Sequence, residues 1–464
     1  MPFSLPLARR RLLRRPSSQL VREPTPYEHQ KAYNCDPPMT FSADTCLRLA
    51  LVLLFALCSL DVRATVESPD ADVLINPDKQ GELITDWGYD IKENGKADHL
   101  TPELAQNLFV EDKMTCLRLP IYGDAQHPAH PADGKVIESY YTGILQAMAN
   151  ARKAKSDVVF FASKKLFEGK TFPGWVKNAN GVIPEAYARM LADYLSFMQA
   201  HGFVIDILGV DNEMEYNKGD INPQKFQEII DNLRSLSRTR GFTMPRRLIG
   251  PDSYNPKPEW VRRLDNMGWG DRLDIVGTHY YPNRPIRKLN NLVRAKGARP
   301  VWHTELHWGD RPNADIFNES QRALAAFFDC TDNGLTGFVW WDYARTNATI
   351  RGGIQEALTQ STIKARPIEV DDGNGKGSRI VLGQLIVRAF RNDTSIVVWA
   401  INNNPTGAYE DYKFRLENGS APNKVSYKQW ATAGLTSGMA TLINQNTFTV
   451  TLPPKTITLV TIPE

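Results

Sequence analysis

Residues 184–213 read PEAYARMLADYLSFMQAHGFVIDILGVDNE and hold one full step of the pattern on which the fold rests. The part Pro184–His201 opens with proline, has apolar residues at helical spacing, and predicts a helix. The apolar run IDILGV at Ile205–Val210 predicts a buried strand. A second capped helix is predicted from Asn222 to Arg240, and the run RLIG at Arg247–Gly250 predicts the next strand. Helix and strand in alternation predict a parallel sheet covered by helices.

The same alternation extends outward in both directions from this stretch. Eight strand-like runs are predicted: Leu83–Tyr89, Met114–Pro120, Val158–Ser163, Ile205–Val210, Arg247–Gly250, Asp274–His279, Pro300–Glu305 and Gly337–Trp341. Eight strands alternating with helices over about 260 residues are typical of a (β/α)8 TIM barrel, an α/β fold. A doubly wound sheet is the alternative, but no Gly-x-Gly-x-x-Gly or Walker-type loop follows the early strands. We therefore predict the barrel.

The segments that flank the barrel have different patterns. After about residue 365, alternating runs separated by Asn, Gly and Pro predict a C-terminal antiparallel β-sandwich domain; the runs are Arg379–Phe390, Thr394–Ile401, Asp411–Leu416, Lys424–Trp430 and Asn446–Ile462. Ala71–Asn76 is also strand-like, and we expect it to pair into that domain. The predicted domains are 1–64 (extension and signal peptide), 65–82 (N-terminal strand), 83–360 (catalytic barrel) and 361–464 (β-sandwich).

Composition limits the kinds of partner. The 464 residues are 42% hydrophobic and 23% charged, which excludes a mostly disordered chain and a multi-span membrane protein. The formal charge of +3 is concentrated at the N-terminus, since residues 65–464 hold 46 basic and 47 acidic side chains. This nearly neutral body gives no reason to expect binding to nucleic acid or to an anionic membrane. The oligomeric state stays open.

The N-terminal segment predicts export. The run LALVLLFALCSL at Leu49–Leu60 has the length of a signal-peptide core and is too short to span a bilayer. Met39 stands where the initiator of such a peptide is expected. We therefore predict a secreted or periplasmic protein with no membrane insertion after signal removal. Cys116 and Cys330 would then remain, as buried free thiols by our interpretation, with one bridge between them as the alternative.

Polar residues collect at the predicted strand ends, where barrel enzymes carry their chemistry. The fourth strand leads into Asn212 and Glu213, and the seventh ends at Glu305. Two carboxylates facing each other across the barrel mouth are what glycosidic cleavage requires. Arg118 and Tyr281, from the second and sixth strands, are expected to stabilise Glu305 as a nucleophile. Glu213 is expected to act as the acid.

Aromatic residues and histidines at the same end support two different interpretations. Aromatic faces pack on sugar rings, and we expect a substrate wall from Trp175, Trp308 and Trp341, with Trp302 and either Trp340 or Trp341 in the barrel core. Alternatively, His303, Glu305 and His307 alternate and project from one face of an extended segment, as metal ligands do. This keeps a metal-dependent barrel hydrolase as a rival.

Five motifs together resemble the retaining glycoside hydrolases of clan A, and family 30 within it. They are Asp86-Trp87-Gly88-Tyr89, Phe161-Ala162-Ser163 with Pro173-Gly174-Trp175-Val176-Lys177, Asn212-Glu213, His279-Tyr280-Tyr281 and Thr304-Glu305. The resemblance implies that Glu213 is the acid/base and Glu305 the nucleophile. It also implies that Asn212 holds the sugar 2-hydroxyl, that Arg118 and Tyr281 orient Glu305, and that His279 belongs to the site. Met214 stands where the family commonly has proline, and Lys164-Lys165-Leu166 replaces an apolar stretch.

The resulting hypothesis is an exported retaining β-glycoside hydrolase that acts within a polysaccharide by double displacement and needs no cofactor or metal. Cations near the barrel mouth, Lys164, Lys165, Arg345 and Arg351, hint at an anionic polysaccharide, although neutral glycans fit equally well. Besides the metal-dependent hydrolase, a non-catalytic carbohydrate-binding protein on the same scaffold is the second rival.

Overall fold

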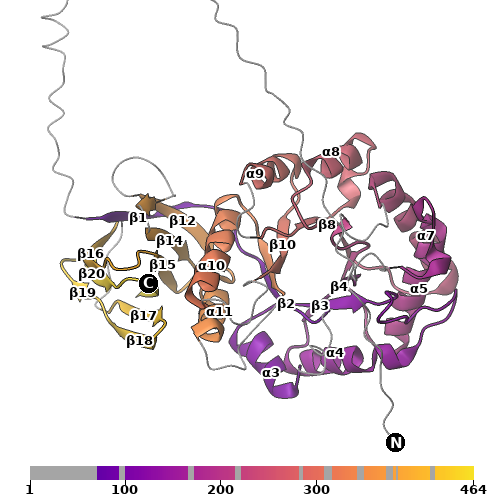
Figure 1. Cartoon of the computed structure of the whole chain (residues 1–464), viewed down its shortest axis with the longest axis horizontal. Helices are drawn as coiled ribbons and strands as arrows, with labels where there is room; N and C mark the ends of the chain where they lie inside the picture. The colour runs from indigo at the N-terminus through magenta and orange to yellow at the C-terminus, as the bar shows by residue number, and fades with distance from the viewer. Residues whose placement is uncertain are drawn as a thin grey trace, which may run out of the picture. The chain divides into compact units, whose positions relative to one another are not determined.

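The computed structural model describes residues 71–92, 100–165, 172–214, 221–281, 286–307, 316–341, 350–371, 380–382, 385–418 and 424–464. Residues 67–464 form one compact unit. Figure 1 shows two parts within it. One is a ring of helices around inner strands, and the other is a second sheet beside helices α10 and α11. The predicted extension and signal segment, residues 1–64, lies outside the described residues. The domain limits given above therefore stay predictions.

The predicted barrel is confirmed. Its strands are β2 (Asp86–Asp90), β3 (Cys116–Ile121), β4 (Val159–Lys164), β7 (Ile207–Gly209), β8 (Arg247–Ser253), β9 (Ile275–Thr278), β10 (Val301–Leu306) and β11 (Gly337–Trp340). They pair in parallel in this order, and β11 closes the ring onto β2, with Gly337 opposite Asp86 and Trp340 opposite Tyr89. Each predicted strand overlaps one observed strand. The C-terminal ends of all eight consequently meet at one end of the barrel.

Helices cover the outside of the barrel. They are α3 (Pro102–Gln106), α4 (Thr142–Ala154), α5 (Pro184–Ala200), α7 (Pro223–Arg240), α8 (Pro258–Asn266), α9 (Ile286–Ala295), α10 (Ile316–Asp332) and α11 (Ile350–Thr362), with short turns η1 (Asn107–Glu111), η2 (Glu138–Tyr140), η3 (Gly174–Val176) and η4 (Gly270–Arg272). Helix α7 follows the predicted signals: the Asn222 side chain accepts from the Lys225 N–H, and Gly241 ends the helix at φ 76°.

The barrel interior is filled by a small apolar cluster around a tryptophan. Trp302 is buried against Phe161 and Ile275, among other strand residues. A Cβ atom on Gly337 of the adjacent strand would lie 2.5 Å from the Trp302 indole, so only glycine leaves room for the ring. Trp302 is therefore core, as predicted. Cys116 is in the same cluster, and both Cys116 and Cys330 are buried and free, which excludes the alternative bridge.

The second sheet has eleven strands. They are β1 (Val73–Gln80), β12 (Arg366–Asp371), β13 (Ile380–Leu382), β14 (Leu385–Arg391), β15 (Ser395–Asn402), β16 (Tyr409–Leu416), β17 (Ser426–Ala431), β18 (Gly434–Met439), β19 (Thr441–Leu442), β20 (Thr447–Leu452) and β21 (Thr456–Pro463). The predicted N-terminal strand is β1, which pairs antiparallel with β12 and parallel with β16. The other pairings in the sheet are antiparallel. A short hairpin, β5 (Lys177–Asn178) with β6 (Gly181–Val182), stands apart from both sheets.

Two predicted runs of this sheet are each two strands. The run Arg379–Phe390 contains the hairpin β13–β14, in which Leu382 pairs with Leu385. The run Asn446–Ile462 is divided into β20 and β21, because Pro453 and Pro454 cannot donate to a strand ladder. Strand β18 was not predicted from its sequence, GLTSGM. Buried side chains from β14, β15, β16, β20 and β21 form one cluster, as expected of a sandwich.

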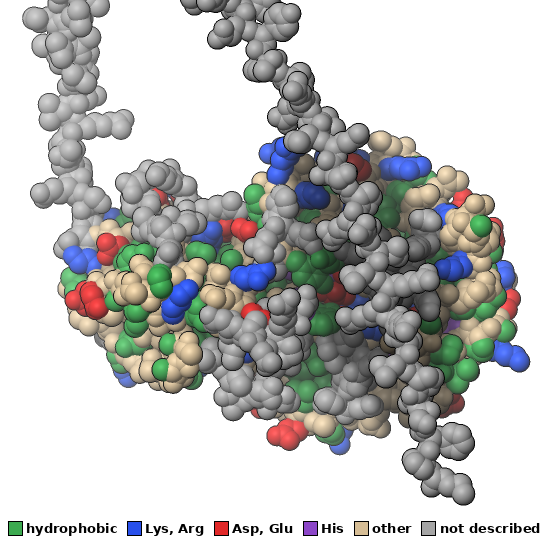
Figure 2. Space-filling model, viewed as in Figure 1, with side chains coloured by type: hydrophobic (Ala, Val, Ile, Leu, Met, Phe, Trp, Pro, Cys, Tyr) green, Lys and Arg blue, Asp and Glu red, His purple; other side chains and the backbone are tan. Residues whose placement is uncertain are grey.

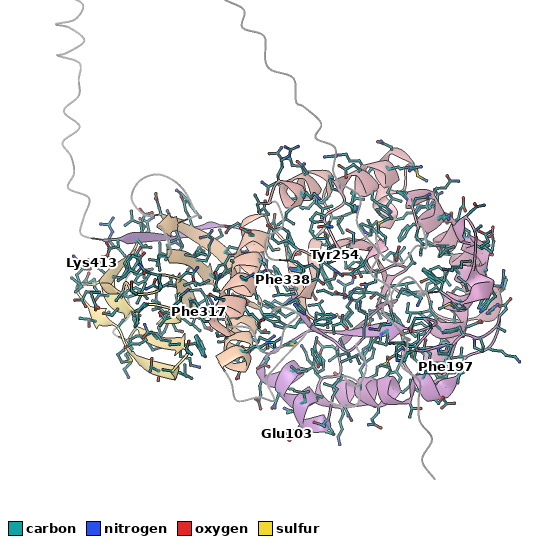
Figure 3. The ribbon with its side chains drawn as sticks, in the orientation of Figure 1. Glu103, Phe197, Tyr254, Phe317, Phe338 and Lys413 are labelled. Carbon is teal, nitrogen blue, oxygen red and sulfur yellow. The ribbon has the colours of Figure 1, made fainter. Side chains whose placement is uncertain are left out.

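The other face of the sheet shares its core with the barrel. Trp399 and Trp430 stack with ring centroids 5.8 Å apart, and the Trp399 indole donates to Ser361 Oγ of α11. Phe390 lies 5.7 Å from Phe327 of α10. Figure 3 places Phe317 of α10 on the side of the sheet, where Lys455 Nζ lies 5.2 Å from its ring centroid. The barrel and the sheet are thus joined by a common apolar core.

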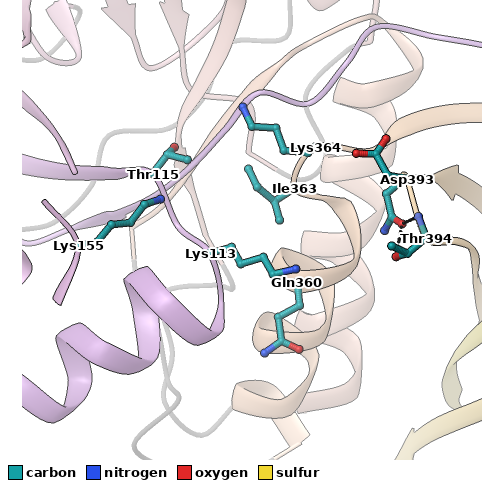
Figure 4. Close-up of a pocket in the computed structure, with 9 residues that line it drawn as sticks. Lys113, Thr115, Lys155, Gln360, Ile363, Lys364, Asp393 and Thr394 are labelled. Atoms are coloured by element: carbon teal, nitrogen blue, oxygen red, sulfur yellow. Dashed lines mark hydrogen bonds between the residues drawn. The ribbon is translucent and has the colours of Figure 1, made fainter. Parts of the chain in front are cut away.

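The surface carries charges of both signs. On the face in Figure 2, acidic and basic side chains are interspersed over the described residues. Among the described helices, none is long and apolar enough to cross a bilayer. A cavity of about 450 Å³ lies between the N-terminal end of the barrel strands and the second sheet (Figure 4). Its lining includes Lys113, Lys155 and Lys364 but none of the residues predicted to form the site.

Candidate active site

The structure brings the two predicted glutamates together. Glu213 follows β7 and Glu305 lies on β10, and β8 and β9 separate these two strands in the barrel ring. His279, directly after β9, lies between them. One oxygen of each carboxylate and one imidazole nitrogen of His279 are all within 4.8 Å of one another. Because these groups leave parallel strands at the same end, the barrel topology alone places them in one site.

Glu305 is buried among positive groups. Its Oε1 accepts from Arg118 Nη1 at 2.7 Å and from Lys92 Nζ at 2.9 Å. Its Oε2 accepts from the Tyr281 hydroxyl at 3.1 Å and lies 3.4 Å from His279 Nδ1. Burial opposes the charged form, but His279, Lys92 and Arg118 outweigh it and hold the pKa of Glu305 well below its ordinary value. Glu305 is therefore a carboxylate, as a nucleophile must be.

Glu213 has a different setting. Its backbone is held at φ 50°, and its N–H donates to the Asp252 carbonyl at 2.8 Å. Its Oε1 lies 3.0 Å from His279 Nδ1. Burial lowers the pKa of His279, yet Glu305, Asp252 and Glu213 raise it to about 9, so the ring is positively charged at neutral pH. Among the described residues, the Glu213 carboxylate thus contacts the cationic ring of His279, whereas the Glu305 carboxylate contacts Lys92 and Arg118 as well.

Arg118 links most of the site. The guanidinium is fully buried and donates to six residues: Asp90 (2.9 Å), Ser163 (3.1 Å), Asn212 (2.6 Å), Asp252 (2.6 Å), the carbonyl of Thr304 (2.9 Å) and Glu305 (2.7 Å). A buried charge is tolerated only when it is paired in this way. The predicted role of Arg118 beside Glu305 matches this geometry. Asn212 joins the same network, since its Oδ1 also accepts from Lys92 Nζ at 2.8 Å.

The predicted tryptophans are placed unequally. Trp341 is half-buried, and its ring lies 4.3 Å from that of His307, which in turn is 6.0 Å from Tyr281. This chain of rings connects Trp341 to the site. Trp175 packs on the core and donates to the His130 carbonyl at 2.9 Å, and no such ring contact joins it to the described site residues. Trp308 lies outside the described residues. Trp340 is the core member of its pair, as expected.

Three acidic and basic residues of the site were missed from the sequence. Asp90 is the last residue of β2, Lys92 lies two residues beyond it, and Asp252 lies in β8. The fifth strand was expected to end at Gly250, before a proline, whereas β8 continues to Ser253 and carries Asp252 into the network. A charged residue directly after an apolar run was the available signal. Asp252 is fully buried, and Arg118 and His279 hold its pKa below the ordinary value although burial opposes them.

The alternative metal trio is not assembled. Among the described residues, the donors close enough for one ion belong to Glu213, His279 and Glu305, not to His303, Glu305 and His307. Burial lowers the pKa of His303 to about 3, so that ring is neutral. Glu305 already contacts two cationic side chains, Lys92 and Arg118. A metal ion at the carboxylate pair would have to compete with both.

The predicted anionic-substrate cations are also only partly placed. Lys164 is fully buried and its Nζ donates to the carbonyls of Ile121 and Lys165 at 3.2 Å each. Burial lowers its pKa to about 7. The expectation that Lys164 stands at the mouth to meet substrate is therefore wrong, because its ammonium is used inside the fold. Lys165 is also buried, Arg351 is half-buried on α11, and Arg345 lies outside the described residues.

Comparison with known proteins agrees with this fold. No protein-family model matches the chain. Glucuronoxylanase XynC of Bacillus subtilis (strain 168) is 26% identical over 289 residues, which are 59% of this chain and 65% of that protein. The match thus spans less than two thirds of the relative. A family 30 subfamily 8 xylanase from Clostridium acetobutylicum has a TM-score of 0.64 at 19% identity, over 85% of this chain and all of that one. A family 30 endoxylanase from Clostridium papyrosolvens C71 has a TM-score of 0.62 with the same identity and coverage.

Proposed function

We propose that this chain, a family 30-like glycoside hydrolase by homology and fold, cleaves a xylan-type polysaccharide at internal bonds with retention of configuration. The observation that carries the mechanism is the pair of carboxylates, which lie within 4.8 Å of each other beside His279. Retaining enzymes hold their two carboxyl groups about 5–5.5 Å apart, whereas inverting enzymes need roughly 6.5–9.5 Å to admit a water molecule. The close approach supports a covalent intermediate.

In the first step, Glu305 attacks the anomeric carbon. Lys92, Arg118 and Tyr281 orient its carboxylate, and the cations keep it free of a proton. Glu213 protonates the departing glycosidic oxygen as the bond to carbon breaks. In the second step, Glu213 takes a proton from water, the water oxygen bonds to the anomeric carbon, and Glu305 leaves.

Asn212 is proposed to bind the sugar 2-hydroxyl. Its Oδ1 is occupied by Lys92 and Arg118, so the amide nitrogen is the group that remains to donate. Tyr281 and the ring chain His307–Trp341 provide an aromatic edge for a sugar face. These contacts fit a neutral sugar at the cleaved bond.

The test is a panel of polysaccharides, with glucuronoxylan, unsubstituted xylan and β-glucans, given to the protein and to Glu213→Gln and Glu305→Gln. Release of reducing ends from xylan by the parent, lost in both variants, is the expected result. Activity that withstands exhaustive chelation would exclude the metal-dependent rival. Binding without cleavage, unchanged in both variants, would instead favour the carbohydrate-binding protein.

We also propose that the chain is exported to the periplasm or the medium. The support is the apolar run Leu49–Leu60 with small residues after it, ending near Ala64. Expression of the full chain with a C-terminal tag, followed by mass determination of the N-terminus, tests this. A product that begins near residue 65 is expected, whereas an intact N-terminus inside the cell would contradict export.

A further inference from the structure

Lys92 holds an unusual position beside the proposed nucleophile. It lies two residues beyond Asp90 at the end of β2, and Asp90 Oδ1 accepts its backbone N–H at 2.6 Å. Its ammonium is 2.9 Å from Glu305 Oε1, 2.8 Å from Asn212 Oδ1 and 3.8 Å from Asp90 Oδ2. Only 2% of the residue is exposed. A long, flexible side chain is thus fixed with its charge on one atom of the reacting carboxylate.

The two oxygens of Glu305 are therefore different. Oε1 accepts from Lys92 and Arg118, and these two donors occupy its lone pairs. Oε2 accepts only the Tyr281 hydroxyl among described residues and lies toward His279, on the side of Glu213. Oε2 is accordingly the oxygen with a lone pair available for attack. In the resulting ester, Oε1 becomes the carbonyl oxygen.

We propose that Lys92 is a further catalytic residue of this site, whose ammonium on Oε1 accelerates the release of Glu305 from the glycosyl-enzyme. The inference rests on the proposed retaining mechanism. In the release step, a bond forms between the water oxygen and the anomeric carbon, and the bond from that carbon to Oε2 breaks. One water proton passes to Glu213, and the electron pair of the broken bond returns to Glu305, where Lys92 stabilises the regained charge.

The same cation acts in opposite directions on the two steps. A positive charge on Oε1 makes the carboxylate a weaker nucleophile in the first step and a better leaving group in the second. Removal of the charge should therefore slow the second step far more than the first. Asn212 stays in place without Lys92, because Arg118 Nη2 still donates to its Oδ1 at 2.6 Å. The proposed contact to the 2-hydroxyl is retained.

The experiment compares the parent with Lys92→Met, which keeps the length but not the charge, and Lys92→Arg, which keeps the charge. With 2,4-dinitrophenyl β-xylobioside the leaving group is so good that the second step limits turnover. We expect kcat of Lys92→Met to fall about 10- to 100-fold, the loss of one charge-assisted hydrogen bond. KM should fall with it, and after the burst of about one dinitrophenolate per site, which this substrate gives with every form of the enzyme, the steady phase should be slower than in the parent. Lys92→Arg should restore part of kcat and of KM.

A second readout is the pH profile of kcat/KM. Loss of the cation should move its acidic limb to higher pH, because Glu305 then holds a proton more readily. The other described titratable or charged groups around this carboxylate are unchanged in the variant: Arg118, Glu213, His279, His303 and Tyr281, with Asp90 and Asp252 behind Arg118.

Lys164→Met is the matched control, since Lys164 is also a buried strand-end lysine but bonds two backbone carbonyls. Its kcat, KM and steady phase after the burst should match those of the parent. If Lys92→Met lowers kcat and kcat/KM equally, or if the control shows the same fall in kcat and KM, the inference is wrong while the glycosidase stands. A parent that cleaves neither xylan nor the aryl glycoside would overturn both.

Discussion

Strand β2 belongs to two regions that bury polar groups in different ways. Near its start, Trp87 stacks on Trp340 at 5.3 Å and on Phe327 at 5.4 Å, and its indole donates to Thr362 at 3.0 Å. At its end, Asp90 is equally buried but pairs with the charged Arg118. We call the first the aromatic region (Trp87, Phe327, Trp340 and Thr362) and the second the charged region (the partners of Arg118). In the aromatic region, one neutral hydrogen bond is enough for each buried polar atom. The charged region requires every member, because a buried ion left without its partner costs far more than a lost neutral bond.

The difference teaches where substitutions should matter. In the aromatic region a substitution should lower the free energy of unfolding through lost packing and leave catalysis unaffected. In the charged region the same groups also set the ionisation of the site. The predictions below test that separation.

The largest effect is expected for Glu305→Gln. Loss of the proposed nucleophile should lower the proposed xylan hydrolysis by about 10⁴-fold or more. The neutral amide also leaves Lys92 and Arg118 with less compensating charge, so the midpoint of urea unfolding should fall. Reducing-end assays and urea titration measure the two effects. Hydrolysis that survives would mean that another group attacks the sugar.

Glu213→Gln should be the next most severe. Removal of a general acid/base typically costs about 10²–10⁴-fold. Azide needs no general base, so it should restore product formation on an activated aryl glycoside and yield a glycosyl azide of retained configuration. Nuclear magnetic resonance of the product measures this. An azide product of inverted configuration would contradict the covalent intermediate.

Asp252→Asn tests whether the charged region also carries stability. The Asp252 carboxylate pairs with Arg118 at 2.6 Å, and the Asp252 backbone carbonyl accepts from the Glu213 N–H. Breaking a buried pair should lower the free energy of unfolding by about 3–5 kcal/mol. Denaturant titration at neutral pH measures the change. A loss below about 1 kcal/mol would show that the network tolerates an unmatched charge and would remove the contrast with the aromatic region.

The pH dependence of stability should have two opposing components. Because the pKa of His279 rises from 6.5 to about 9 on folding, its ion pairs with Glu305, Asp252 and Glu213 contribute stability that is complete below pH 6.5. That contribution, about 3 kcal/mol, is lost as the pH rises from 6.5 to 9. The lowered pKa of Lys164, about 7 in place of 10.5, acts in reverse and adds stability as the pH rises from 7 to 10.5.

Urea titrations of the parent, His279→Gln and Lys164→Met at pH 6, 7.5 and 9 separate these components. The His279 variant should lose less stability than the parent on going from pH 6 to pH 9. The Lys164 variant should lose more. Parallel curves for all three proteins would contradict the ionisation of the site described above.

The smallest effect is expected in the aromatic region. Trp87→Phe removes the hydrogen bond to Thr362 and part of the ring contact, at a cost of about 1–3 kcal/mol. The kcat of the folded protein should stay within twofold of the parent. A fall in kcat comparable to that of Asp252→Asn would show that the two regions are not separable.

Much of the fold was predictable because period and end signals are local. The eight barrel strands and the capped helix α7 have periodic apolar residues and recognisable ends, which need no knowledge of distant contacts. The hairpin β13–β14 was merged into one run, because a short apolar stretch does not show where the chain reverses.

The site was predictable only as far as strand ends could be located. Glu213, Glu305, Arg118, His279 and Tyr281 follow or lie in clear apolar runs, and the structure gathers them. Lys92 and Asp252 were missed because a lone charged residue beside a strand is ordinarily solvated. Only the assembled barrel places both against Arg118 or Glu305. The burial of Lys164 could not be predicted from the sequence either, since it depends on a backbone carbonyl of the neighbouring strand that accepts from its ammonium.

Strand β1 imposes an order of events on synthesis. It pairs Leu74 with Asp371 of β12 and Val73 with Phe414 of β16, so its partners leave the ribosome about 300 residues after it. At roughly 5–20 residues per second, β1 spends about 15–60 s without a partner while the entire barrel is translated. Its alternating apolar residues, Val73 and Ile75, are fully buried only after the C-terminal strands arrive. Strand β1 is therefore paired only after the C-terminal strands β12 and β16 have been made. A chain truncated before residue 366 would present β1 as an unpaired strand edge that is prone to aggregate.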